Sequence, residues 1–218
     1  INFFNLMEIF RPIYKLIVNY LDSKQKNQGI TNFNFNDIHL NDTKVLKDRE
    51  TLLELLPKNG IVCELGVNKG NFSEKILKVN KPKKLHLVDI WASERYSSKL
   101  QKLVENKFSK EIDRNQVEIN KGYSIEILKS FNDNYFDWIY IDTTHNYQDT
   151  IEELNLSKLK VKSNGIITGH DYITRSKSLG IKYGVVEAVN EFCVKHNWKL
   201  IYITLECNGH SSFAIKKI

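Results

Sequence analysis

One segment in the first third of the chain, residues 61–74, constrains the fold most. The mostly apolar run Ile61–Leu65 is typical of a buried parallel strand, and Gly66 and Gly70 follow it directly. Asn71 then opens an amphipathic helix. Glycine lets the backbone approach a ligand closely, and the first turn of a helix has unpaired N–H donors. The segment therefore predicts a site for a nucleotide-like ligand.

The spacing of this turn distinguishes it from two common phosphate-binding loops. Glu64, Gly66 and Gly70 give the pattern E-x-G-x-x-x-G. It has neither the third glycine of the dinucleotide pattern G-x-G-x-x-G nor the Gly-Lys-Ser/Thr end of a Walker loop. This absence makes an NAD-dependent dehydrogenase the least favoured function.

Strands and helices alternate after residue 60, which predicts a Rossmann-like, doubly wound α/β fold. A short helix is expected at 45–56, and further helices at 71–79, 95–108, 123–131, 148–158 and 184–196. Seven strands are expected at 61–65, 84–90, 116–120, 138–142, 165–168, 200–204 and 212–215. The link between the last two, residues 205–211, is too short for a crossover helix. The seven-stranded sheet is therefore mostly parallel with an antiparallel last strand.

Residues 1–56 are expected to form an N-terminal helical cap or linker, and residues 57–218 the α/β domain. Apolar positions recur at helical spacing over 2–22, but Glu8 and Arg11 interrupt them, which argues against a signal peptide. No run reaches the roughly 20 apolar residues that would span a bilayer. The three cysteines form no C-x-x-C motif, which favours reduced thiols. We therefore expect a cytoplasmic protein without a membrane partner.

The net charge of +6 and the pI near 9 raise nucleic acid as a partner. However, the lysines at 81–84 and 158–162 precede expected strands. Ligands of open α/β sheets bind beyond the carboxyl ends of the strands. These lysines are thus expected at the wrong edge, and a solvated basic surface is favoured over nucleic-acid binding.

Candidate ligand contacts also follow the second and third expected strands. Asp89 ends the second strand, nineteen positions after Gly70, where an acid can accept both ribose hydroxyls. A turn residue at a strand end is the alternative. Gly122 turns the chain after the third strand, and Ser124 either caps the next helix or contacts a base.

Two acid and histidine pairs follow the fourth and fifth expected strands. Asp142 and His145 come after the fourth strand, and His170 and Asp171 after the fifth. Burial explains the apolar residues of these strands but not the polar pairs. Since the two strands should be neighbours, the four side chains are expected to converge on one site.

Four motifs in this order resemble class I S-adenosylmethionine-dependent methyltransferases over residues 55 to 218. The closest resemblance is to methyltransferase family 24, near the macrocin O-methyltransferase and cephalosporin-hydroxylase-like proteins. The motifs are Glu64-x-Gly66-x-x-x-Gly70, Asp89-Ile-Trp91, Asp142-x-x-His145-x-Tyr147 and Gly169-His170-Asp171-Tyr172. The resemblance implies S-adenosylmethionine as cofactor. By the same resemblance the cofactor contacts are Glu64, Gly66 and Gly70 at the methionine part, Asp89 at the ribose, Ser124 near the adenine, and Asp142.

Several members of the resembled group bind a divalent metal through acids at the same two strand ends. Asp142 and Asp171 match these positions, whereas His170 stands where such relatives more often carry an acid. Mg²⁺ prefers oxygen ligands, while imidazole suits Mn, Fe, Zn or Ni better. A metal such as Mg²⁺ or Mn²⁺ at Asp142, His170 and Asp171 is therefore a hypothesis.

The leading hypothesis is O-methylation of a small molecule, such as a sugar or natural product. His145 titrates near neutrality and is the first candidate for the general base, with Asp142 second. A helix-start hydrogen bond is the alternative role for His145. An RNA methyltransferase and a non-catalytic cofactor-binding or scaffold protein remain rival functions. The loops after Asp89 and at 173–183, with Arg95 and Lys177, are expected to shape the acceptor pocket. The acceptor and the oligomeric state stay open, with a homo-oligomer as one option.

Overall fold

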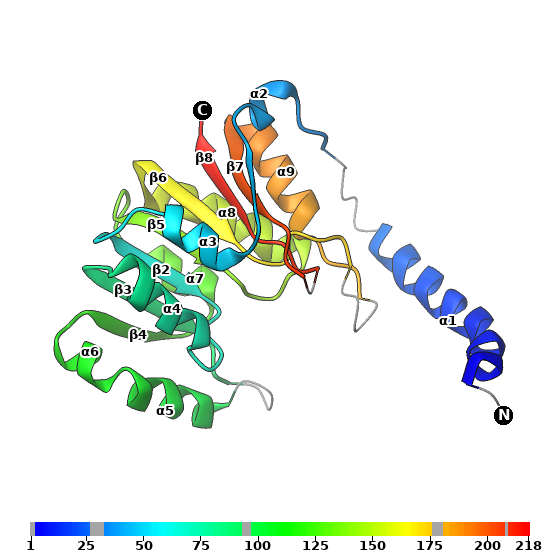
Figure 1. Cartoon of the computed structure of the whole chain (residues 1–218), viewed down its shortest axis with the longest axis horizontal. Coiled ribbons are helices and arrows are strands. Elements are labelled where there is room, and N and C mark those ends of the chain that lie inside the picture. Colours follow the sequence, from blue (N-terminus) through cyan, green and yellow to red (C-terminus); the bar gives the residue numbers. More distant parts are fainter. Residues whose placement is uncertain (1–2, 27–32, 93–96, 176–180, 208) are drawn as a thin grey trace.

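The computed structural model describes residues 3–26, 33–92, 97–175, 181–207 and 209–218. Helices and strands alternate through most of them (Figure 1). The helices are α1 Phe3–Lys26, α2 Asp37–Leu40, α3 Arg49–Leu55, α4 Asn71–Asn80, α5 Ser98–Lys107, α6 Ser109–Asp113, α7 Ser124–Ser130, α8 Tyr147–Lys160 and α9 Val185–His196. The strands are β1 Lys44–Leu46, β2 Ile61–Leu65, β3 Lys84–Asp89, β4 Val117–Lys121, β5 Phe136–Ile141, β6 Val161–Gly169, β7 Trp198–Thr204 and β8 Phe213–Lys217.

Across the described residues the strands form one sheet in the order β1-β7-β8-β6-β5-β2-β3-β4. All neighbours pair in parallel except β8, which runs antiparallel to both β6 and β7. The expected α/β sheet with an antiparallel last strand is therefore confirmed, and each of the seven expected strands is present. β1 adds an eighth strand at the edge, which the sequence did not predict.

The expected helix at 45–56 is wrong at its start. Val45 and Leu46 lie in β1 and pair with Ile203 and Thr204 of β7, and α3 begins only at Arg49. A strand of three residues is too short for an alternating pattern, so its conformation depends on hydrogen bonds to β7. Residues 22–42, within the expected N-terminal cap or linker, contain the end of α1 and the short helix α2.

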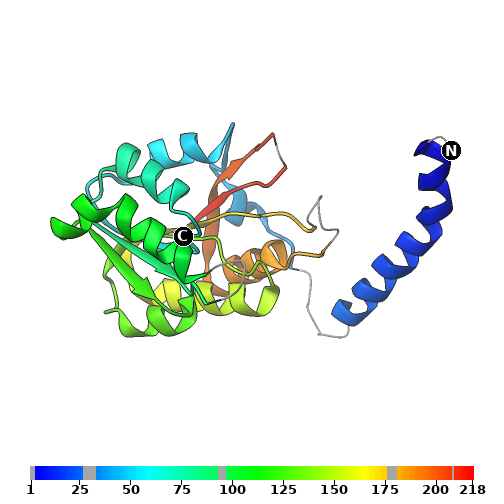
Figure 2. The ribbon, with the colours of Figure 1, turned by 90° about the horizontal axis from the view of Figure 1, so that it is seen from below.

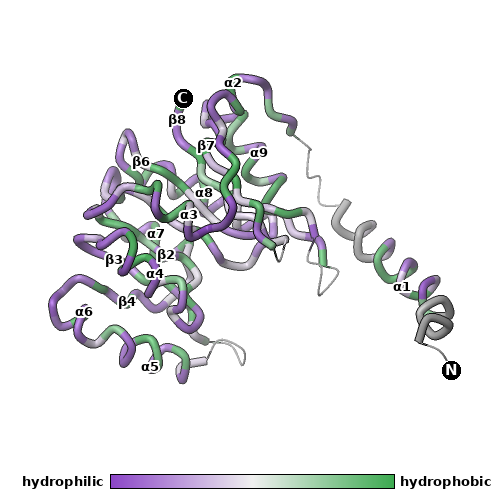
Figure 3. Tube along the Cα trace, in the orientation of Figure 1, coloured by the Kyte–Doolittle hydropathy of each residue, from purple (hydrophilic) through white to green (hydrophobic). Residues whose placement is uncertain are grey.

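The sheet separates two hydrophobic clusters, one on each face. Successive strand residues point to opposite faces, so Ile139 and Ile141 of β5 join one cluster while Trp138 and Tyr140 join the other. Helices α7, α8 and α9 cover the first face, and α3, α4 and α5 cover the second. Figure 3 shows the hydrophobic residues along these elements, with hydrophilic residues in the outer loops. The strand ends between the helix layers are thereby held in fixed positions.

The N-terminal segment has two parts that differ in their packing. Helix α1 extends away from the sheet (Figures 1 and 2), and its apolar residues Phe10, Ile13 and Ile17 are each more than half exposed. In contrast, Leu52 and Leu53 of α3 are completely buried on the sheet. Among the described residues, no helix is long and apolar enough to cross a membrane.

Candidate active site

The turn between β2 and α4 lies against the end of β5. Gly66 has a φ of +89°, and a Cβ atom there would be only 1.9 Å from the carbonyl oxygen of Asp142. Gly70 has a φ of +70°, and a Cβ there would meet the ring of Phe108 at 2.8 Å. Both positions therefore need glycine, for the left-handed backbone and for close packing. The turn leaves the N-terminus of α4 beside the carboxyl ends of β2 and β5.

Asp89 holds the same turn from the end of β3. Its Oδ2 accepts hydrogen bonds from the backbone N–H groups of Val67 and Asn68, both at 2.8 Å. Its Oδ1 accepts a bond from the N–H of Trp91 at 3.2 Å. The carboxylate thus organises the turn in this structure, and its predicted contact with ribose hydroxyls stays a prediction.

Glu64 is buried inside the site, with a side chain that points to α4. Its Oε2 accepts a hydrogen bond from the hydroxyl of Ser73 in the first turn of that helix. Burial raises the pKa of Glu64 to about 8, although this hydrogen bond opposes the rise. A cation next to Glu64 would offset that burial penalty, because an opposite charge favours the ionised carboxylate.

A second buried acid links α7 and α8 to the loop after β5. Glu153 accepts hydrogen bonds from the hydroxyls of Ser124 and Thr143, the latter at 2.8 Å. Burial raises the pKa of Glu153 to about 7. Ser124 is the first residue of α7 and its side chain does not cap the helix, since Tyr123 occupies the cap position. The capping role considered from the sequence is therefore wrong, and Ser124 is tied to the loop that carries the candidate catalytic groups.

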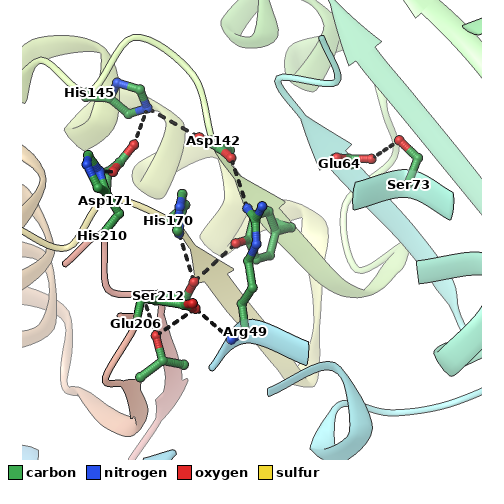
Figure 4. A network of polar contacts seen from close by, with 12 residues as sticks. Arg49, Glu64, Ser73, Asp142, His145, His170, Asp171, Glu206, His210 and Ser212 are labelled. Carbon is green, nitrogen blue, oxygen red and sulfur yellow. Dashed lines mark hydrogen bonds and ion pairs between the residues drawn. The ribbon is translucent and has the colours of Figure 1, made fainter. Parts of the chain in front are cut away.

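Three side chains converge at the carboxyl ends of β5 and β6 (Figure 4). Nε2 of His145 lies 2.9 Å from Oδ2 of Asp171 and 3.3 Å from Oδ1 of Asp142. Burial disfavours the imidazolium, but its hydrogen bonds and the charges of the two acids outweigh this and raise the pKa of His145 to about 9. The ring also stacks on Tyr183, with 4.8 Å between centroids. His145 is thus held as a hydrogen-bond donor between two carboxylates.

His210, from the loop between β7 and β8, contacts the other oxygen of Asp171. Burial opposes ionisation of this carboxyl, yet the hydrogen bonds from His145 and His210 lower the pKa of Asp171 to about 2. His145 and Asp171 both have left-handed backbones, with φ values of 60° and 56°. Such conformations in residues other than glycine are uncommon and often accompany functional sites.

His170 lies outside this group of three. Its Nδ1 makes a hydrogen bond of 2.9 Å with the hydroxyl of Ser212, which is 3.3 Å from the hydroxyl of Tyr140. Burial lowers the pKa of His170. By contrast, Asp142, His145 and Asp171 each offer one ligand atom, and these atoms lie within 4.8 Å of one another. Two carboxylates and an imidazole form a donor set that suits Mn²⁺ better than Mg²⁺. The geometry therefore favours His145 over His170 as the third ligand of any metal.

Arg49, the first residue of α3, reaches the same edge of the sheet (Figure 4). Its Nη1 lies 3.8 Å from Oδ2 of Asp142, and its guanidinium stands 4.7 Å above the ring of Phe72. Arg49 lies in the segment expected to be an N-terminal cap or linker, and it is not among the site residues predicted from the sequence. No motif surrounds Arg49 in the sequence that would indicate its position beside Asp142.

A family model described as a methyltransferase domain matches residues 63–172, half of the chain. The chain belongs to this methyltransferase family. No sequence of a curated protein matches it. The matched segment contains the glycine turn, Asp89 and the cluster at Asp142, His145 and Asp171, but it excludes Arg49 and His210.

Solved structures similar to this methyltransferase share its fold at low sequence identity. A SAM-dependent methyltransferase from Aquifex aeolicus has a TM-score of 0.57 and 17% identity, over 79% of this chain and 91% of that one. The B. subtilis tRNA methyltransferase TrmK has a TM-score of 0.57 and 13% identity, over 80% and 67% of the two chains. The pyocyanin biosynthetic protein PhzM has a TM-score of 0.57 and 12% identity, over 78% of this chain. This match spans only 54% of PhzM.

The methyltransferase thus brings most of the sequence-predicted residues to one edge. The turn after β2 contains Gly66 and Gly70, and next to it lie Glu64, Asp89 and Asp142. Ser124 is linked to the loop after Asp142 through Glu153. Five further site residues are not predicted from the sequence, namely Arg49, Ser73, Glu153, His210 and Ser212. Their signals are weak because each is a single polar residue in a helix or loop, without a motif around it that indicates its partner. Arg95 and Lys177, expected in the acceptor pocket, lie outside the described residues.

Proposed function

We propose that this methyltransferase transfers the methyl group of S-adenosylmethionine to a hydroxyl oxygen of a small molecule. One observation carries the proposal. The cluster of Asp142, His145 and Asp171 adjoins the glycine turn, since Gly66 touches the backbone of Asp142. A hydroxyl nucleophile must lose its proton during transfer, and this cluster offers proton-accepting groups beside the cofactor turn.

The acidic members of the cluster are the better proton acceptors. His145 donates toward both Asp142 and Asp171, so its imidazole already carries the proton at Nε2. Asp171 is engaged on both oxygens by histidines and is buried. Asp142, whose side chain is 26% exposed, is the acid that an acceptor hydroxyl can approach. In this assignment Asp142 takes the proton and His145 orients it, which reverses the order expected from the sequence.

A divalent metal fits the same three residues and would lower the pKa of a bound hydroxyl. Asp142, His145 and Asp171 would hold it. Without the metal, the residues of this chain still position the acceptor. Much of the rate of methyl transfer comes from such positioning, because the nucleophile must lie in line with the sulfonium methyl group.

Methylation of RNA is the rival function, and the distribution of charged residues disfavours it. Lys84 and Lys162 lie near the amino ends of β3 and β6, opposite the candidate site, and pair with Glu118 and Asp137. Paired lysines at the far edge give little attraction for a phosphate backbone at the site.

A labelling experiment separates these functions. The protein is incubated with S-adenosylmethionine labelled in the methyl group and with either small metabolites or total RNA from cells. We expect label in the small-molecule fraction, in products that gain one methyl group on oxygen. The Asp142→Asn variant should lose about 100-fold or more in rate, as removal of an acid–base group typically does. Label confined to RNA would establish the rival, and cofactor binding without transfer to either fraction would indicate a non-catalytic protein.

A further inference from the structure

We propose that Arg49 forms a carboxylate-binding subsite for the amino-acid end of S-adenosylmethionine, which rests on the function proposed above. The methionine part of this cofactor carries an ammonium, a sulfonium and one carboxylate. The subsite would bind the carboxylate. It would be contributed by a segment that lies before the matched methyltransferase domain of residues 63–172.

The backbone of Arg49 is fixed on both sides. Asp48 caps α3, because its Oδ1 accepts hydrogen bonds from the N–H and the hydroxyl of Thr51, both at 2.8 Å. The N–H of Arg49 itself donates to Oε1 of Glu206 at 2.6 Å. Glu206 follows β7, and the hydroxyl of Thr204 lies 3.2 Å from the same carboxylate oxygen. The start of α3 is therefore fixed to the end of β7 through Glu206, and this fixes the backbone from which the Arg49 side chain extends.

The guanidinium is also positioned before any ligand binds. It lies over the ring of Phe72 in the first turn of α4 and interacts with the hydroxyl of Tyr140. Stacking on an aromatic face leaves the edge of the guanidinium, with its N–H donors, directed away from the ring. Binding a carboxylate there loses little side-chain entropy, since the arginine is already held in place.

The charges around Arg49 match the charges of the ligand. Glu64, Asp89 and Asp142 lie at the carboxyl ends of three neighbouring strands. In their ionised forms these acids suit the ammonium and sulfonium groups but would repel a carboxylate. The charge of Arg49 is close enough to favour the ionised form of Glu64. The positive charge of Arg49 would thereby offset the repulsion between the acids of the site and the carboxylate of the ligand.

The contact between Arg49 and Asp142 leaves the guanidinium able to take a second carboxylate. Their closest atoms are 3.8 Å apart, whereas a charge-assisted hydrogen bond between these groups measures about 2.7 to 2.9 Å. Arginine has five N–H donors in a planar fork that matches a carboxylate. A ligand carboxylate can therefore form the short bidentate contact that Asp142 does not.

Calorimetric titration with two ligands tests the subsite. S-adenosylhomocysteine carries the ammonium and the carboxylate, and its decarboxylated amine analogue keeps only the ammonium. The full-length protein should bind S-adenosylhomocysteine about 10- to 100-fold more tightly than the analogue, as expected for hydrogen bonds between charged groups. In Arg49→Gln this preference should disappear through weaker binding of S-adenosylhomocysteine alone. Arg49→Lys should retain part of it, since lysine keeps the charge but not the fork.

Lys47→Gln is the matched control, because it removes a cation two residues away whose side chain is 78% exposed. It should leave both affinities unchanged. If Arg49→Gln kept the preference, or weakened both ligands equally in a protein with an unchanged melting temperature, the subsite would be refuted. If the unmodified protein bound neither ligand, the proposed function itself would fail. The two failures are thus distinguishable.

Discussion

Replacing Gly66 with alanine tests the closest backbone approach in the site, and Gly70 on the same turn provides a matched control. Both glycines have left-handed φ values, +89° and +70°. Alanine at either position costs about 1 to 2 kcal/mol in backbone strain. They differ in what the new Cβ meets. At Gly66 it would lie 1.9 Å from the backbone oxygen of Asp142, and at Gly70 it would lie 2.8 Å from a ring carbon of Phe108.

The end of β5 must move to admit Ala at position 66. Non-bonded heavy atoms rest about 3.5 Å apart, so the carbonyl of Asp142 must retreat by about 1.5 Å. This strains the hydrogen bond of 2.8 Å between the N–H of Asp142 and the carbonyl of Leu65. Overpacking of this kind costs about 1 to 3 kcal/mol. We therefore expect Gly66→Ala to lower the free energy of unfolding by about 2 to 5 kcal/mol in total. For Gly70→Ala the loss should be about 1 to 2 kcal/mol, because the ring of Phe108 can turn aside.

Urea denaturation monitored by tryptophan fluorescence and circular dichroism measures both losses. Calorimetric titration of the same samples measures their affinity for S-adenosylhomocysteine. Gly66→Ala should bind this ligand more weakly than Gly70→Ala, because the new Cβ displaces Asp142. Equal losses of stability in the two variants would refute the reasoning, since backbone strain alone would then account for both.

Two further predictions concern the buried acid and the metal. Burial raises the pKa of Glu153 to about 7 from the ordinary 4.5 of a solvated glutamate, so the folded state retains its proton more strongly than the unfolded state. Its contribution to stability is therefore lost as pH rises through this window, by roughly 3 kcal/mol. Glu153→Gln should remove that part of the pH dependence in urea denaturation, and parallel curves for both proteins would contradict the assignment. Calorimetric titration of metal-stripped protein with Mn²⁺ should detect one site, which Asp171→Asn abolishes and His170→Gln preserves. If His170→Gln abolished Mn²⁺ binding, the ligands would instead include His170, as expected from the sequence.

The sequence predicted the sheet well because its strands are long and buried. Continuous apolar runs such as Ile61–Leu65 identify a strand whatever its neighbours are. The antiparallel β8 followed from the length of a single link. In contrast, β1 has three residues and depends on β7, which is more than 150 positions away in the sequence. No local pattern could have revealed it.

The candidate site was predictable where its groups directly follow strands. Asp89, Asp142 and Asp171 come after β-strand patterns, so topology alone places them at one edge. The choice between His145 and His170 was not predictable, because it depends on backbone conformations after the strands. Arg49 was missed since its position depends on packing of α3 against the sheet.

Both proposals require S-adenosylmethionine to bind at the edge formed by the glycine turn and the ends of β3 and β5. Hydrogen–deuterium exchange with saturating S-adenosylhomocysteine tests this most directly. We expect the ligand to slow exchange at residues 64–70, 89–91 and 142–145, with smaller effects around 49. Protection confined to the opposite edge, at residues 81–84 and 158–162, or no protection anywhere, would contradict the account.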